Sequence, residues 1–288
     1  MFCDLHMHST ASDGTDAPQD LPALAAEAGL AAFALTDHDT TAGLPACAAA
    51  AEKAGLTFVP GIELSADPGS LDGGPDGLRR GTLHILGYFV DDDDPELARL
   101  ESWLAKVREQ RNPAMVERLS ELGVQIDYGE VLEQAGGRVV GRPHIAQVLV
   151  KKGYVKSIHE AFARYIGEGA AAHVRKDRLS PAEAIAAIHH AGGLAVLAHP
   201  VQLHLPEPGQ LEQLTARLKQ AGLDGIEIRH HDHQPGDVAR FARLAERLDL
   251  VVTGGSDYHG TRKQNRLGET GLERAEFEKL LATRAGQG

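Results

Sequence analysis

The sequence predicts an α/β fold in which parallel strands alternate with helices, interrupted by a helical insertion. Short apolar runs alternate with Ala-rich helical segments in the first third of the chain, and the alternation resumes in the last third. Between about residues 96 and 169, apolar residues keep a helical spacing and no strand pattern is visible. Strand–helix alternation with short links is typical of a parallel sheet covered by helices. We therefore expect an α/β domain made of residues 1–95 and 170–288, and a helical substrate cap at residues 96–169.

The first third supplies four expected strands, at residues 2–5, 31–36, 56–60 and 82–90. Helices are expected at 21–28 and 46–54, where Gly29 and Gly55 follow directly, as glycine often does at the end of a helix. Residues 67–80 are rich in Gly, Pro and Asp and predict a surface loop.

The insertion begins with an expected helix at 96–122, because Asp94 can cap it and Pro95 suits its first position. Shorter helices are expected at 131–135, 143–151 and 158–165. The last third then predicts strands at 194–198, 225–228 and 250–253, and helices at 181–191, 211–220, 238–248 and 277–283.

The composition excludes several classes of protein. The 288 residues include 29 Lys and Arg against 41 Asp and Glu, a net charge of −12, which argues against a basic surface that binds extended duplex DNA. Two cysteines cannot form a disulfide scaffold, and we see neither a membrane span nor a signal peptide. We therefore expect a cytoplasmic protein without a membrane or an obligate protein partner.

Histidines and carboxylates gather at the ends of the expected strands. In parallel α/β barrels these ends form one face, so residues far apart in sequence converge there. His6 and His8 share one side of an extended segment, as do Asp257 and His259. Nine residues of this kind are candidate metal ligands: His6, His8, Asp13, His38, Glu63, His84, His199, Asp257 and His259.

Each of these motifs has an ordinary explanation when taken alone. A single His-x-His can be a coincidence of the surface, and Thr36-Asp37-His38-Asp39 can be a turn. Their conjunction at six strands instead predicts a multinuclear metal centre. Imidazole and carboxylate together suit Mn²⁺, Zn²⁺ or Fe²⁺, and thiols are absent from every expected strand end.

The ordered motifs resemble those of the PHP family, named for polymerase and histidinol phosphatase. The matching segments are His6-Met7-His8-Ser9, Thr36-Asp37-His38-Asp39, Gly61-Ile62-Glu63, His84, Ala198-His199-Pro200 and Gly255-Ser256-Asp257-Tyr258-His259. The resemblance implies a distorted (β/α)₇ barrel with two or three metal ions at the carboxyl ends of its strands. Gly141-Arg142-Pro143-His144 resembles a narrower subgroup, which hydrolyses 3′,5′-nucleoside bisphosphates and degrades short RNA from the 5′ end.

Carried onto this chain, the resemblance implies three divalent ions, Mn²⁺ first, with Zn²⁺ or Fe²⁺ as alternatives. His6, His8, Glu63 and Asp257 would hold the first ion. Asp13, His38 and His259 would hold the second. Glu63, His84 and His199 would hold the third, with Glu63 as a bridge.

The expected activity is removal of the 3′-phosphate of a 3′,5′-bisphosphonucleotide, such as adenosine 3′,5′-bisphosphate, with short RNA as a further substrate. Bridging metal ions lower the pKa of bound water from 15.7 towards about 7, so a hydroxide held between them could attack the phosphate without a Ser or Cys nucleophile. The second phosphate of the substrate needs a separate cation, and the candidates are Arg142, Arg175 and Lys176. Three histidines, His230, His231 and His233, follow the strand expected at 225–228. Of these, we expect His233 to face the substrate cleft.

Three alternatives stay open on the sequence. A histidinol-phosphate phosphatase, or another small-molecule phosphatase of the same family, would use the same ligands, although the insertion argues against it. A non-catalytic, metal-bearing polymerase accessory module would predict missing ligands or a fused partner. An amidohydrolase would usually carry a metal-bridging lysine in mid-chain, and no lysine occurs between Lys53 and Lys106.

Overall fold

A computed structural model describes residues 1–67, 83–136, 140–167, 169–174, 179–205, 207 and 209–286. The chain divides into two compact units, Met1–Leu100 with Leu179–Gly288, and Glu101–Arg178. The sequence predicted an insertion at residues 96–169, whereas the second unit spans Glu101–Arg178 and therefore starts and ends several residues later. The predicted loop at 67–80 lies, except for Asp67, outside the described residues.

The first unit is built on a seven-stranded sheet whose strands follow one another in chain order. The strands are β1 Cys3–Asp4, β2 Ala32–Leu35, β3 Thr57–Ala66, β4 Leu83–Tyr88, β5 Leu194–Leu197, β6 Gly225–Arg229 and β7 Val251–Gly254. Beyond the ends of β1 and β7, Leu5 N donates to Gly254 O at 3.2 Å, and Met7 and Tyr258 form an isolated parallel bridge. The sheet is therefore a nearly closed barrel, and the expected distorted (β/α)₇ barrel is confirmed.

Strand β4 departs from the parallel pattern that the alternation predicted. It pairs antiparallel with both β3 and β5, whereas the other neighbouring strands pair parallel. The amino end of β4 therefore lies at the same rim as the carboxyl ends of the other strands. Strand β3 also extends to Ala66, well past the predicted end at Pro60, and so carries Glu63 within it.

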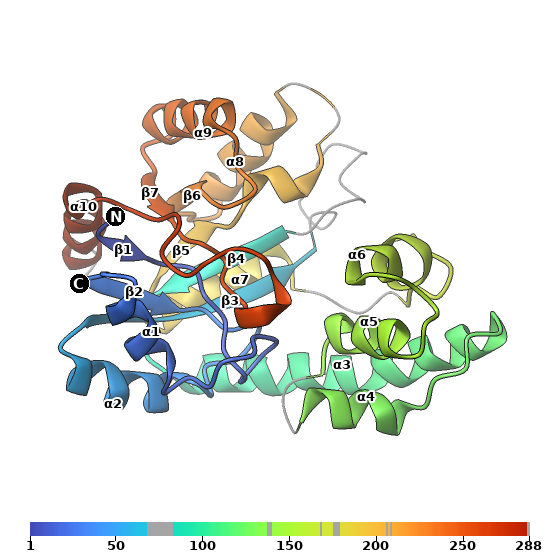
Figure 1. Ribbon diagram of the computed structural model, residues 1–288. Helices are drawn as coiled ribbons and strands as arrows, with labels where there is room; N and C mark the ends of the chain where they lie inside the picture. The colour runs from blue at the N-terminus through green and yellow to red at the C-terminus, as the bar shows by residue number, and fades with distance from the viewer. Residues whose placement is uncertain are drawn as a thin grey trace. The chain divides into compact units, whose positions relative to one another are not determined.

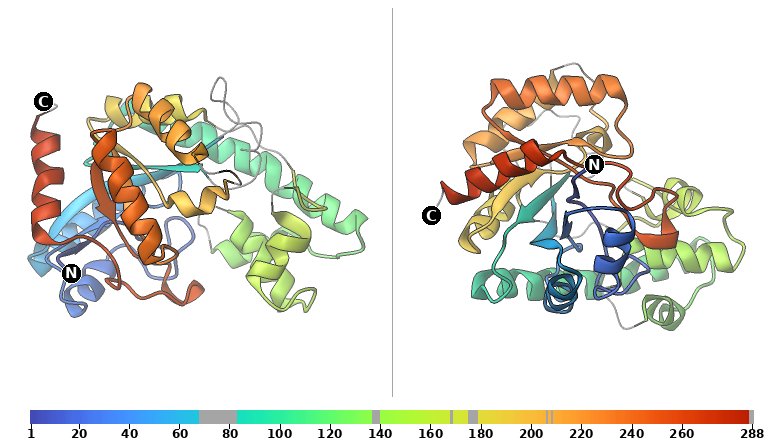
Figure 2. Two further views of the ribbon diagram at one scale, coloured as in Figure 1. Left: turned by 90° about the horizontal axis from the view of Figure 1, so that it is seen from above. Right: turned by 60° about the vertical axis from the view of Figure 1, so that its left-hand side comes forward.

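Helices cover the outside of this sheet: α1 Leu21–Glu27, α2 Leu44–Ala54, α7 Pro181–His190, α8 Gln210–Gln220, α9 Pro235–Arg247 and α10 Arg274–Ala285. Figures 1 and 2 show α1 and α2 on one side of the strands and α8 and α9 on the other. Ser180 caps α7 in a reciprocal capping box with Glu183, and Gly55 ends α2 at a φ of +68°. Two short 3₁₀ turns, Pro200–Leu203 and Gly260–Arg262, follow β5 and β7.

Alternate strand residues fill the core of the barrel unit. Cys3 and Leu5 pack with Leu86, Tyr88 and Val196, all fully buried, because alternate side chains of a strand point to the same face. No helix in the described part of the chain is long and apolar enough to span a membrane.

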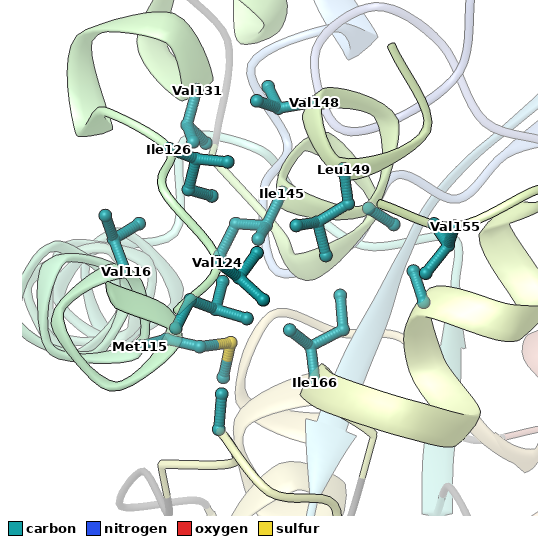
Figure 3. Packing of buried hydrophobic residues seen from close by; sticks show 14 residues of the cluster. Met115, Val116, Val124, Ile126, Val131, Ile145, Val148, Leu149, Val155 and Ile166 are labelled. Atoms are coloured by element: carbon teal, nitrogen blue, oxygen red, sulfur yellow. The ribbon is translucent and has the colours of Figure 1, made fainter. Parts of the chain in front are cut away.

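The second unit is helical. It contains most of α3, Pro95–Glu121, followed by α4 Tyr128–Ala135, α5 Arg142–Lys151, α6 Ile158–Ala161 and a π-helical turn at Phe162–Ile166. The predicted helix at 158–165 thus changes to a wider turn at its midpoint. Its core joins apolar side chains of these helices, including Met115, Ile145, Leu149 and Ile166 (Figure 3).

Candidate metal centre

The nine predicted ligands lie at one rim of the barrel unit. His6 and His8 follow β1, His38 follows β2, Glu63 lies on β3, and His84 lies at the start of β4. His199 follows β5, Asp257 and His259 follow β7, and Asp13 comes from the segment before α1. All nine occur in groups of side chains whose ligand atoms lie within 4.8 Å of one another: His8, Asp13, His38 and His259; His6, His230 and Asp257; His6, Glu63 and His199; and His38, Glu63 and His84.

Glu63 is the centre of these contacts and is fully buried. Its Oε2 lies 3.2 Å from Nε2 of both His6 and His8, and 3.0 Å from Nδ1 of His38. Its Oε1 lies 2.7 Å from Nδ1 of His84 and 2.9 Å from Nε2 of His199. Burial opposes ionisation of Glu63, but the surrounding imidazoles hold its pKa well below the usual range. Both oxygens of one carboxylate are therefore aimed at different sets of imidazoles, as a bridging ligand requires.

Asp13 and Asp257 flank Glu63 on the side of β1 and β7. Asp13 Oδ1 lies 3.2 Å from Nε2 of His259, and Asp257 Oδ1 lies 3.3 Å from Nε2 of His8. Burial lowers the pKa of His84 to about 3 and that of His259 to about 4, which leaves neutral imidazoles suited to binding a metal ion. For His8, burial acts in the same direction, but Asp257 and Glu63 raise its pKa to about 9.

Hydrogen bonds among the side chains leave several donor atoms of the site unsatisfied, and a metal ion would satisfy them. Among the described residues, Nε2 of His6, Nε2 of His8, Oδ1 of Asp13 and Oε2 of Glu63 are buried and form no hydrogen bond. Buried polar atoms of this kind carry a large desolvation cost unless they are satisfied. Their convergence on common points, with nitrogen and carboxylate oxygen donors only, matches sites for Mn²⁺, Zn²⁺ or Fe²⁺.

Buried carboxylates outside the predicted set orient the ligands. Glu227, on β6, accepts from Nδ1 of His6 at 3.0 Å and from the backbone N–H of His199 at 2.8 Å. Asp4 accepts from the backbone N–H groups of His6 and Ser256. A carboxylate that fixes a histidine ring also fixes which nitrogen faces the ion. Glu227 was detectable in principle, since it is a charged residue in the middle of a predicted apolar strand.

Asp37 and Asp39, which flank His38 in the sequence, each hold a neighbouring segment. Asp37 accepts from the backbone N–H of Ser9 at 2.8 Å and from its hydroxyl at 2.6 Å. Asp39 accepts from the backbone N–H of Ser65 at 2.7 Å. The first contact fixes the turn that follows His8, and the second fixes the strand that carries Glu63.

The backbone is tight where ligands leave the strands. Asp257 has a φ of +53° and His199 a φ of +25°, in the left-handed region that costs a side chain of order 1–3 kcal/mol. A Cβ on Gly255 would meet the backbone N of His6 at 2.3 Å. Only glycine therefore allows the segment after β7 to come close enough to β1 for Asp257 to reach His6 and His8.

His230 and Lys263 lie beside Asp257, and the sequence did not single out either of them there. Nε2 of His230 is 3.2 Å from Asp257 Oδ2, and the Lys263 ammonium contacts the same oxygen. His233 was favoured over its neighbours, but its Nδ1 bonds Ile228 O at 3.0 Å and its ring packs against Phe241. In the described residues it belongs to none of the ligand groups.

The predicted substrate contacts of the inserted segment lie outside the barrel unit or outside the described residues. Arg142 is the first residue of α5, and its guanidinium lies over the ring of Phe162, 5.4 Å from the centroid. His144 Nδ1 accepts from the backbone N–H of Gly141 at 3.0 Å, so part of this motif serves to begin α5. Arg175 and Lys176 lie outside the described residues.

A nearly closed α/β barrel with buried imidazoles and carboxylates clustered at one rim defines the class of metal-dependent barrel hydrolases. Residues 4–208 match the PHP domain, and the chain belongs to the PHP domain family. The resemblance read from the motifs is thereby confirmed, and phosphoester hydrolysis is supported as the activity of the chain.

Curated relatives cover nearly all of the chain. A phosphoribosyl 1,2-cyclic phosphate 1,2-diphosphodiesterase of Eggerthella lenta is 37% identical over 90% of this chain and 95% of that protein. A 3′,5′-nucleoside bisphosphate phosphatase of Chromobacterium violaceum is 34% identical over 89% of this chain and 86% of that protein. A 5′-3′ exoribonuclease of Haemophilus influenzae is 34% identical, covering 89% of each chain.

A crystal structure shares the whole fold. A candidate metal-dependent phosphoesterase of Bifidobacterium adolescentis is 33% identical, with a TM-score of 0.85 over 98% of this chain and 96% of that chain. All these relatives have names that describe cleavage of a phosphorus–oxygen bond.

Proposed function

We propose that the chain hydrolyses the 3′-phosphate of 3′,5′-bisphosphonucleotides, giving the 5′-nucleotide and phosphate. The observation that carries the proposal is the convergence of nine histidines and carboxylates, Glu63 among them, at one rim of the barrel in a member of the PHP family. In this reaction the bond between phosphorus and the 3′ oxygen breaks, the oxygen of water bonds to phosphorus, and a proton goes to the leaving 3′ oxygen.

The residues of the site would have three roles: supplying negative charge, supplying nitrogen ligands and positioning the ligands. Glu63, Asp13 and Asp257 supply three negative charges, and the histidines around them supply nitrogen lone pairs. Divalent ions held by these residues would neutralise the phosphoryl oxygens and activate the attacking water. Glu227 and Asp4 would keep the ligands in place without contacting substrate, because both are buried behind His6.

The choice of a bisphosphonucleotide rests on two supports. The C. violaceum relative carries that name, and the Gly141-Arg142-Pro143-His144 motif resembles that of enzymes with this activity. The exoribonuclease relative supports short RNA as a further substrate of the same site, since both reactions cleave phosphate esters on a nucleotide.

A second candidate is a cyclic sugar phosphate. The E. lenta relative, which is more similar to this chain at 37% identity over 95% of its length, is named as a diesterase for phosphoribosyl 1,2-cyclic phosphate. Such a substrate would need the same ligands but would carry no base.

The test is a hydrolysis screen on protein loaded with Mn²⁺, in which mass spectrometry identifies and quantifies the products, because cleavage of RNA or of a cyclic phosphate releases no inorganic phosphate. The panel contains adenosine 3′,5′-bisphosphate, short 5′-phosphorylated RNA, a ribose 1,2-cyclic phosphate, histidinol phosphate and an aryl phosphate. We expect the highest kcat/KM on the bisphosphate, and a kcat lower by several orders of magnitude for Asp257→Asn on every substrate. A higher kcat/KM on the cyclic phosphate would replace the proposal with the second candidate.

A further inference from the structure

The two oxygens of Asp257 face different partners. Oδ1 lies 3.5 Å from Nε2 of His6, 3.3 Å from Nε2 of His8 and 3.4 Å from Nδ1 of His259. Oδ2 faces the other way, towards Nε2 of His230 and the ammonium of Lys263. Asp257 therefore joins the candidate metal centre through one oxygen and a lysine through the other.

Lys263 reaches this buried carboxylate from the solvent side. The Asp257 side chain is 5% exposed, whereas that of Lys263 is 33% exposed. An ammonium carries three N–H donors, and the contact with Asp257 uses one of them. The ammonium thus lies at the edge of the metal centre, with donors for a group that enters from solvent.

Hydrogen bonds to neighbouring segments hold the loop that carries Lys263. The backbone N–H of Thr261 donates to Thr15 Oγ1 at 3.0 Å, and the side-chain amide of Asn265 donates to Ser256 O. One anchor therefore lies on each side of Lys263 in the sequence. A lysine on a loop held in this way loses less conformational entropy when it binds an anion than a lysine on an unsupported loop.

A lysine at this place is poorly explained by metal binding alone. A protonated amine has no lone pair for a metal ion and repels one. An anionic substrate reverses that balance, because a phosphoryl dianion gains from every fixed cation at the site.

We propose that Lys263 binds the phosphoryl group that is hydrolysed, and that Asp257 holds its ammonium beside the candidate metal centre. This proposal rests on the proposed phosphoesterase function and adds a substrate-binding residue to the site. The ammonium of Lys263, on the loop after β7, would then add its positive charge at the reacting phosphate to the charge of any metal ions.

The test measures the affinity of inorganic phosphate for protein saturated with Mn²⁺, by titration calorimetry. The variants are Lys263→Met, Lys263→Arg and the matched control Lys219→Met, which removes a half-buried lysine on α8 that donates to Asp249 O. We expect Lys263→Met to raise the Kd for phosphate about ten- to a hundredfold, the range of a charged hydrogen bond. Lys263→Arg should restore most of the affinity, and Lys219→Met should leave it unchanged.

Metal content and melting temperature, measured on the same samples, separate binding from positioning. Unchanged phosphate affinity in Lys263→Met at full metal content would overturn the proposal. A loss of Mn²⁺ that accounts for the whole loss of phosphate affinity would also overturn it, because Lys263 would then act only by positioning Asp257. If the parent protein hydrolyses no phosphate ester, the proposed function fails, while the phosphate affinities of parent and variant still report on Lys263.

Discussion

Nδ1 of His84 lies 2.7 Å from Oε1 of Glu63, across two neighbouring strands that run in opposite directions. His84 can meet Glu63 because β4 is antiparallel, so that its first residues lie at the rim where β3 carries its carboxylate. His199 contacts the same oxygen from the other neighbour of β4. One reversed strand therefore completes the set of imidazoles around the buried carboxylate of Glu63.

The first prediction concerns the number of ions. The predicted ligands fall into four groups that overlap at His6, His38 and Glu63, so that neighbouring groups can share an ion, and we expect about three divalent ions per chain at saturation. Elemental analysis after equilibration with Mn²⁺ and removal of free metal measures this number. One ion or none per chain would contradict the predicted ligand sets.

The second prediction is that removal of metal ions destabilises the fold. Each ion that binds only the folded chain, at a hundred times its dissociation constant, adds about 2.7 kcal/mol to the free energy of unfolding. For a domain of this size that corresponds to a rise in melting temperature of roughly 5–10 °C. The melting temperatures of Mn²⁺-loaded and chelator-treated protein measure it, and His8→Ala, which removes one candidate ligand, should show a smaller difference.

The third prediction is that Asp257→Asn and His8→Ala each lower kcat by several orders of magnitude, because charge compensation and water activation are lost together. Both residues lie at the rim rather than in the apolar core, so the barrel should still fold. Steady-state kinetics and circular dichroism measure the two effects. Turnover close to that of the parent, at full metal content, would show that the residue is not a ligand.

The sequence predicted which residues meet at the rim better than it predicted what surrounds them. Most of the nine candidates lie next to short apolar runs, so local pattern sufficed to place them near strand ends, although Asp13 comes from the connection before α1 and Glu63 lies within β3. The direction of β4 was not predictable, because an apolar run in the sequence does not indicate whether its strand pairs parallel or antiparallel with its neighbours. His230 and Lys263 escaped prediction for a similar reason, since only the path of the loops after β6 and β7 brings them to Asp257.

The fourth prediction concerns the pH dependence of stability at Asp94. Its carboxylate accepts from the backbone N–H of Leu97 at 2.8 Å, which caps α3, and from Nδ1 of His190 at 2.8 Å. Burial acts to raise the pKa of Asp94, but the hydrogen bonds from Leu97 and His190 outweigh it and lower this pKa below its ordinary value. A carboxylate with a lowered folded pKa stabilises the fold above the unfolded pKa of about 3.9, and this contribution is lost as the pH falls through the folded value.

Asp94→Ala should therefore lower the free energy of unfolding by about 1 kcal/mol at pH 7, the usual value of a helix cap. The difference from the parent should narrow as the pH falls below about 4. Urea unfolding at several pH values measures it. Asp94→Asn keeps an acceptor for Leu97 without a titrating group, so its cost should be smaller. A difference between parent and Asp94→Ala that is independent of pH would contradict the role of the charge.

The fifth prediction tests Arg142 as the residue for the second phosphate of a bisphosphonucleotide. The forked guanidinium suits a phosphate remote from the reacting centre. Arg142→Ala should lower kcat/KM for the bisphosphate about ten- to a hundredfold, or roughly 1.5–3 kcal/mol, and barely change hydrolysis of an aryl phosphate. Arg164→Ala is the matched control, because Arg164 is exposed and pairs with Glu160 at 2.8 Å within the same helical unit.

The comparison of the two substrates decides between three roles for Arg142. Equal losses on bisphosphate and aryl phosphate would place its guanidinium at the reacting phosphate. No loss on either would leave Arg142 with the contacts seen within the helical unit, over the ring of Phe162 and to the carbonyl oxygen of Ile166. A loss confined to the bisphosphate requires a contact that only the second phosphate makes, because an aryl phosphate has the reacting group but no remote one.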